Sequence, residues 1–174
     1  MTVARELAEF LTRTSSSDLP RQAVKHAATL IASTIASAAM GARLESSEII
    51  PTLARERSGS PEASAWFASG PKLPVSGAAQ VNAVMSDAAA SDDSDLRNIV
   101  HAGTTLVASA LAMAERTADS GEDVLAAIVL GYEAAGRIGE AMTPGFRTRG
   151  RGRPALCPPA VFARLRPRRG HASF

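Results

Sequence analysis

The sequence has few cysteines, which could cross-link a small fold, and few aromatic residues, which could fill its core. It has one cysteine, and aromatic residues make up only 4% of its 174 positions. Cys157 alone cannot form an internal disulfide, and with three scattered histidines it offers too few ligands for a zinc cage. We therefore expect no structural metal and no cofactor, and the reducing cytoplasm is the expected compartment.

Long hydrophobic runs are also missing. The longest uncharged stretch, residues 26–42, is interrupted by four hydroxyl side chains and falls short of the roughly 18–20 apolar residues that a membrane span needs. The N-terminus places Arg5, Glu6 and Glu9 where a secretory signal would have a basic stub and an apolar run. The sequence thus predicts a buried core helix over residues 26–42 and no membrane partner.

Small apolar residues, above all alanine, replace the missing aromatics. Apolar residues make up 45% of the chain and charged residues 21%, with a mean hydropathy of +0.02, which is typical of a globular chain. Small side chains favour closely packed helices over bulky strands. We predict an all-α, Ala-rich bundle of about five to six helices, the second of them central, with at most a short strand at 63–67. The predicted helices span residues 3–13, 19–40, 47–58, 76–90, 104–117 and 121–142. Gly41 is predicted to stop the second helix, and Ser120 with Asp123 to form a capping box at the start of the last one.

Acidic residues are absent from the last part of the chain. Residues 1–146 carry eleven basic and all seventeen acidic residues, a net charge of −6, whereas residues 147–174 carry eight arginines. We therefore divide the chain into a helical domain, 1–146, and an Arg/Pro-rich tail, 147–174. The tail is interpreted as disordered or out-of-frame, since GC-rich codons read out of frame give arginine, proline, glycine and alanine. The alternative is an arm that binds A·T-rich DNA, because residues 150–154, GRGRP, resemble the core of an AT-hook. A nucleic-acid partner is the less favoured of the two.

Several spaced motifs in residues 76–146 carry more specific information. An Asn-bearing helix (Asn82) is followed by Asp92-Asp93-Ser94, then by His101-Ala102-Gly103, and finally by a helix that contains Gly131-Tyr132-Glu133. In this order the motifs resemble the MmgE/PrpD family, which includes 2-methylcitrate dehydratase, cis-aconitate decarboxylase and iminodisuccinate epimerase. The first two predicted helices also fit, so the resemblance covers residues 1–146.

The resemblance implies a larger helical domain followed by a smaller α+β lid, in chains well over twice this length that commonly form homodimers. The present chain would then be an N-terminal part of the helical domain, incomplete and inactive, with the apolar faces of residues 102–142 exposed. The implied activity is that of a cofactor-independent lyase or isomerase acting on a small polycarboxylate such as 2-methylcitrate. The alternative remains a non-enzymatic helical domain with a DNA-binding arm.

The resemblance also implies the site residues. His101 matches the histidine of the family's His-Pro-Gly motif and is predicted to be an acid–base or substrate-binding group, because histidine changes charge near neutral pH. Ser94 is predicted to donate a hydrogen bond, and Asp92 and Asp93 to orient the loop. Asn82 is the predicted substrate-binding residue.

The chain departs from the family pattern at three positions near these residues, and the site residues also allow other interpretations. Ala90 and Asp87 stand where the family has an aspartate and a histidine, and Ala102 replaces the proline of His-Pro-Gly. His101 could instead be a structural residue at a loop–helix junction. Asp92, Asp93 and Asp95 could form a solvated turn or a cation site, although the spacing of an EF-hand is missing.

Overall fold

The structure of the chain is a computed structural model. It describes residues 2–57, 59–95 and 100–149, with the backbone alone given for 142–149. Residues 150–174, the greater part of the Arg/Pro-rich tail, lie outside the described residues. Both interpretations of the tail, the DNA-binding arm and the out-of-frame segment, therefore stay predictions.

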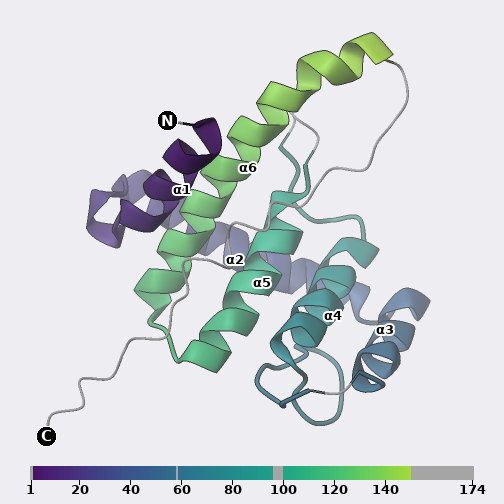
Figure 1. Cartoon of the computed structure of the whole chain (residues 1–174). Helices are drawn as coiled ribbons and strands as arrows, with labels where there is room; N and C mark the ends of the chain where they lie inside the picture. Colours follow the sequence, from purple (N-terminus) through teal and green to yellow (C-terminus); the bar gives the residue numbers. More distant parts are fainter. Residues whose placement is uncertain (1, 58, 96–99, 150–174) are drawn as a thin grey trace, which may run out of the picture.

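The described residues form an all-helical fold without strands, which confirms the predicted class (Figure 1). A short 3-10 helix, η1, follows the first of six α-helices. The helices are α1 (Val3–Arg13), η1 (Ser16–Asp18), α2 (Arg21–Gly41), α3 (Glu45–Arg55), α4 (Val75–Ala88), α5 (Ala102–Thr117) and α6 (Gly121–Arg149).

Helices α4 and α5 form the centre of the fold, and they bury most of their residues, many of them alanines. Small side chains let the helices approach closely, as expected from the composition. Gly41 marks one such contact, since a β-carbon there would lie 1.9 Å from the carbonyl oxygen of Met85. The end of α2 therefore packs directly on the backbone of α4.

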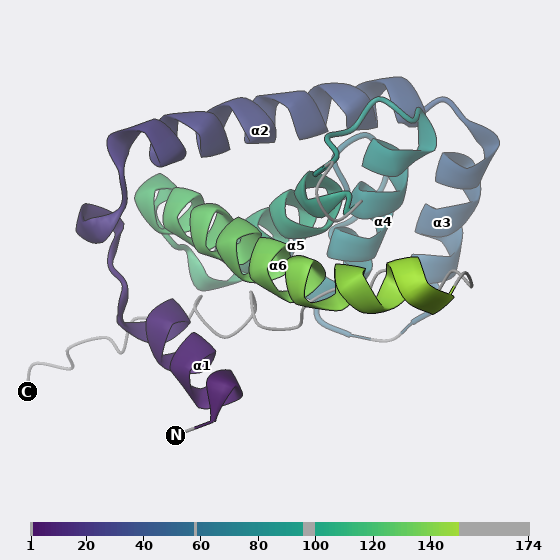
Figure 2. The same cartoon turned by 90° about the horizontal axis from the view of Figure 1, so that it is seen from above.

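The prediction that the second helix is central is wrong. Helix α2 lies along one side of the other helices (Figure 2) and buries only Ala27, Thr34, Ser37, Ala38 and Gly41. The side chains of this helix are apolar or small on nearly every side. Alanine, serine and threonine nevertheless expose little hydrophobic area. Such a helix can lie at the surface at low cost.

Helix ends differ from the predicted ones where proline is involved. Pro20 is the N-cap of α2, and Pro51 lies inside α3 because that helix begins earlier, at Glu45. Helix α6 continues past Pro144 to Arg149 instead of ending near residue 142, since one proline removes a single helical hydrogen bond and need not end a helix. Residues 63–67 form no strand, only an isolated bridge between Ala63 and Leu73.

Other local predictions are confirmed. The first helix has the predicted bounds, 3–13, and the second ends at Gly41 as predicted. The capping box that opens α6 is also present. The Ser120 amide donates to Asp123 Oδ2 at 3.3 Å, and the Asp123 amide donates to the Ser120 hydroxyl at 3.2 Å.

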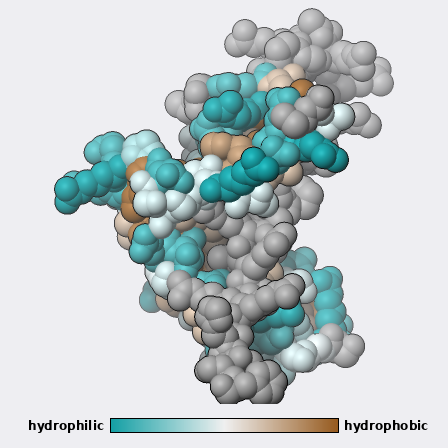
Figure 3. Space-filling model, turned by 60° about the vertical axis from the view of Figure 1, so that its left-hand side comes forward, coloured by the Kyte–Doolittle hydropathy of each residue, from teal (hydrophilic) through white to brown (hydrophobic). Residues whose placement is uncertain are grey.

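Exposed hydrophobic side chains are not where we expected them. Among the described side chains the large exposed ones lie in α1, at the end of α2, in and just before α3, and at Phe67, and none lies in 102–141. On the face shown in Figure 3, hydrophilic side chains divide the hydrophobic surface into separate patches. Helices α5 and α6 thus cover their apolar faces with α1, α2 and α4.

None of the described helices is long and apolar enough to cross a membrane on its own. Helices α2 and α3 would qualify by length and composition only as a pair, and they meet at a bend of 99°.

Candidate functional site

The predicted site residues gather around the loop between α4 and α5. Helix α4 ends at Ala88, and Ala90 adopts a left-handed conformation with φ of 50°, which turns the chain away from the helix axis. Farther on, the amide of Asp95 donates to the carbonyl of Val100 at 3.0 Å. Residues 92–95 and 100–104 therefore run side by side, and we call them the loop neck.

Asp92 and His101 form the first side-chain contact across the neck. The Nδ1 atom of His101 lies 2.9 Å from Oδ2 of Asp92, and the hydroxyl of Thr104 donates to the same oxygen at 2.9 Å. The Asp92 side chain is 2% exposed, whereas that of His101 is 51% exposed. A buried carboxylate thus holds one nitrogen of an imidazole whose ring still reaches solvent.

The position of this pair follows from the start of α5. His101 is the N-cap residue of α5, and Ala102, Gly103 and Thr104 form its buried first turn. The first amides of a helix lack internal acceptors, and its N-terminus carries a partial positive charge. Carboxylates of the loop neck are therefore stabilised at this end of the helix.

Asp93 forms the second contact across the neck. Its Oδ2 accepts hydrogen bonds from the Gly103 amide, at 3.3 Å, and from the hydroxyl of Tyr132 on α6. Its Oδ1 is buried and has no hydrogen-bond partner among the described residues. Burial, and then the hydrogen bond to Asp93, raise the pKa of the Tyr132 phenol far above its usual value, so the phenol stays protonated and donates at neutral pH.

The other predicted residues lie in different surroundings. Ser94 follows the two aspartates and is exposed. Asn82 is fully buried in α4, where its amide accepts from the Trp66 amide at 2.9 Å and donates to the Ser64 carbonyl at 3.0 Å. Asn82 thus anchors the 64–66 segment, and its predicted role in substrate binding stays a prediction.

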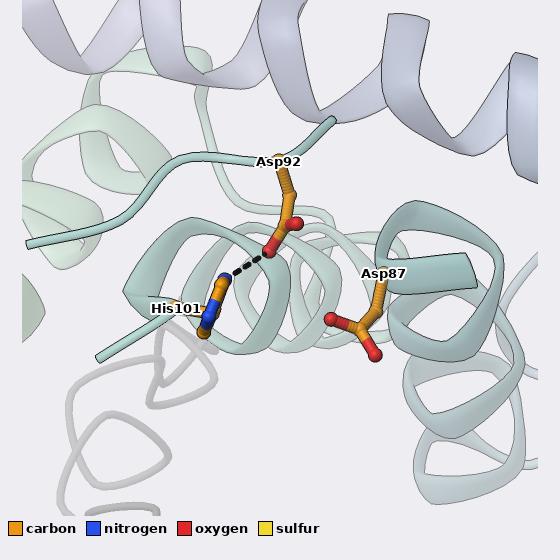
Figure 4. A group of neighbouring side chains, drawn as sticks. All are labelled: Asp87, Asp92 and His101. Atoms are coloured by element: carbon orange, nitrogen blue, oxygen red, sulfur yellow. Dashed lines mark hydrogen bonds and ion pairs between the residues drawn. The ribbon is translucent and has the colours of Figure 1, made fainter. Parts of the chain in front are cut away.

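A cation could be held at one place around the neck. Asp87, Asp92 and His101 each offer one donor atom, and these three atoms lie within 4.8 Å of one another. Figure 4 shows the Asp87 carboxylate directed toward the pair from the end of α4. This set differs from the Asp92, Asp93 and Asp95 cluster considered from the sequence. Imidazole and carboxylate ligands suit divalent transition metals, but the imidazole Nδ1 already contacts Asp92.

Three residues that make contacts in the loop neck were not predicted as site residues: Gly103, Thr104 and Tyr132. The first two follow His101 in the chain, so proximity in sequence was a usable signal. Tyr132 lies 39 residues from Asp93. The signals for it were its place in the Gly131-Tyr132-Glu133 motif and the fact that it is the only tyrosine in the chain.

Comparison with known proteins supports the sequence motifs. A family model described as the MmgE/PrpD N-terminal domain matches residues 5–162. The match includes all of the loop neck and continues past residue 146, where we placed the end of the helical domain. Neither the curated proteins nor the solved structures give a match.

Proposed function

The chain belongs to the MmgE/PrpD family, whose members are lyases that act on carboxylic acids, and from this premise we propose that His101 is an acid–base group of a cofactor-independent lyase or isomerase. Its substrate is a small polycarboxylate of the 2-methylcitrate type. The reaction moves a proton at the carbon beside a carboxylate. Elimination of water, loss of CO2 and re-protonation of the same carbon are all compatible with this step.

The Asp92–His101 pair is the observation that carries the proposal. When Nδ1 carries the proton, it donates to the Asp92 carboxylate 2.9 Å away, and the lone pair of Nε2 is left for a substrate proton. A carboxylate behind a histidine holds the ring in one orientation and stabilises the imidazolium that forms after proton transfer. The half-exposed ring can reach a substrate that approaches from solvent.

The charges of the described residues around the pair support a site to which other groups contribute. Asp87, Asp92 and Asp93 bring three carboxylates to this region. No described lysine or arginine forms an ion pair with any of them. Binding of a polycarboxylate requires cationic groups or N–H donors that pair with its carboxylates. We propose that the remainder of a longer protein, or a second copy in a homodimer, supplies these groups, and that the chain alone has no turnover.

Ser94 and Asn82 keep their proposed roles in this scheme. Ser94 is exposed beside the neck, so its hydroxyl is free to turn toward a bound substrate and donate a hydrogen bond. Asn82 supports the site indirectly while its amide stays bonded to residues 64–66. It contacts the substrate directly only when that segment moves.

A chimera tests the proposal. Residues 5–146 of this chain replace the matching segment of an active family member, and double-bond formation and deuterium uptake beside the carboxylate are followed by absorbance and NMR. We expect turnover in the chimera and a loss of about 10²–10⁴-fold on His101→Gln, the usual contribution of a general acid–base group. The matched control is His26→Gln, an exposed histidine on α2, which should leave turnover unchanged.

Two results would overturn the proposal. One is a folded chimera with no turnover on any family substrate, and the other is undiminished turnover after His101→Gln. Circular dichroism of each variant separates loss of chemistry from loss of the fold.

A further inference from the structure

We propose that Tyr132 is a positioning residue for the Asp92–His101 pair, acting through Asp93. The proposal rests on the role given to that pair above. The phenol of Tyr132 binds Asp93, Asp93 binds the first turn of α5, and these bonds fix the loop neck on which the pair lies.

The position of the phenol in the core gives the first argument. The Tyr132 ring packs against the buried cluster of Ala102 and Leu106 at the start of α5. Its hydroxyl donates to Asp93 Oδ2. The ring is thus held by the core while its polar end reaches the neck, so α6 acts as a fixed support for a loop that belongs to α4 and α5.

The tight fit around Asp93 gives the second argument. A β-carbon on Gly103 would lie 1.9 Å from Asp93 Oδ1 and 2.9 Å from the Tyr132 hydroxyl oxygen. The three groups therefore pack against one another without spare room. A small displacement of the Asp93 carboxylate must move either the helix terminus or the phenol.

The hydrogen bonds to Asp93 give the third argument. Among the described residues its carboxylate has only two donors, the Gly103 amide at 3.3 Å and Tyr132, while its Oδ1 has none. A buried carboxylate with too few donors is costly. Without the phenol, Asp93 gains more by turning to water than by staying in place, and the backbone of the adjacent Asp92 turns with it.

The consequence for the pair follows from its own geometry. Asp92 points to His101 and Thr104, whereas Asp93 points to Gly103 and Tyr132. A shift of this backbone lengthens the 2.9 Å contact between Asp92 Oδ2 and the imidazole. The ring then loses the acceptor that selects which nitrogen carries the proton.

The test reads the imidazole of the full chain directly by nitrogen and carbon NMR, with His101→Gln used to assign its signals. In Tyr132→Phe, which removes one oxygen, we expect His101 to lose its preference for a proton on Nδ1. Among the described residues, the charged groups that face the ring are Asp92 in the loop and Asp87 at the end of α4, and this variant keeps both carboxylates in the sequence. Unchanged His101 signals in a folded Tyr132→Phe chain would overturn the proposal.

Two further variants keep the test decisive. Leu130→Ala removes a buried α6 side chain that packs on Leu11 of α1, so it loosens the helix without touching Asp93. An equal change at His101 in this control would show a general loosening and would also overturn the proposal. If Tyr132→Phe does not fold, Asp93→Ala should alter the His101 signals and Asp93→Asn, which keeps an acceptor oxygen, should largely restore them. Failure of that contrast would count against the proposal in the same way.

The readout also separates the two proposals. It needs no turnover, so a missing lyase activity leaves the NMR result valid. In the active chimera, Tyr132→Phe should lower kcat with little change in KM, because the phenol orients a proton-transfer group and does not touch the substrate.

Discussion

Gly103 lies against Asp93 so closely that a single β-carbon would reach within 1.9 Å of the carboxylate. The first turn of α5 and the loop before it therefore share one packed contact. This contact decides what the helix N-terminus tolerates at position 103, and it gives the first prediction.

Gly103→Ala should destabilise the chain by about 1–3 kcal/mol, the usual cost of forcing a methyl group into a packed site. The clash is with a buried carboxylate, so the neck must open to relieve it. Urea denaturation followed by circular dichroism measures the loss.

The matched control is Gly121→Ala at the start of α6, where an added β-carbon meets nothing within 4 Å. That change should be neutral or stabilising by about 0.5–1 kcal/mol, because alanine is the better helix former. Equal effects at the two glycines would refute the clash.

Tyr132 should titrate far above the usual tyrosine pKa of about 10, because burial and the hydrogen bond to Asp93 both favour the neutral phenol. The raised pKa means that its stabilisation is complete below the unfolded value and declines as the pH rises above about 10. It is the only tyrosine, so phenolate absorbance reports this one group. A phenolate step near 10 in a chain that is still folded would contradict the bond to Asp93.

Glu115 should stabilise the fold at neutral pH and lose this effect in acid. Burial alone would raise its pKa, but hydrogen bonds from Lys72 and Ser64 outweigh burial and hold the pKa below its usual value. The stabilisation is therefore present above the unfolded pKa and is lost as the pH falls through the folded one.

The change Glu115→Gln should cost about 1 kcal/mol at pH 7, since the group is partly exposed, and clearly less in acid. Glu56→Gln, an exposed acid at the end of α3, serves as the control and should have little effect at either pH. A Glu115→Gln penalty that does not vary with pH would contradict the assignment.

Asn82→Ala should cost about 2–3 kcal/mol, because it leaves the Trp66 amide and the Ser64 carbonyl without their partner. Trp66 is the only tryptophan, so its fluorescence should shift as the 64–66 segment is released. Gln80→Ala, an exposed position on the same helix, should change neither property. An unchanged tryptophan spectrum in Asn82→Ala would show that the amide is not an anchor.

Local features of the fold could be predicted because their causes are local. The Ser120 and Asp123 pair lies three residues apart and defines a helix start by itself. Gly41 ends α2 as its sequence predicts. The aspartates and histidine of the neck were recognised because their spacing along the chain matches that of a family.

Long-range pairings could not be predicted in the same way. Nothing near Tyr132 in sequence reveals that its hydroxyl meets Asp93, because that contact depends on how α6 packs on α5. The surface position of α2 was missed for a related reason. Alanine, serine and threonine occur both inside and outside a fold, so the pattern alone does not say which side of a helix faces its neighbours.

The neck contacts described above all lie between residues 92 and 132, within one continuous stretch of the chain. The proposed acid–base group and the residue proposed to position it therefore lie in a single segment, and one exchange of residues 92–132 between related chains would carry all of these contacts together.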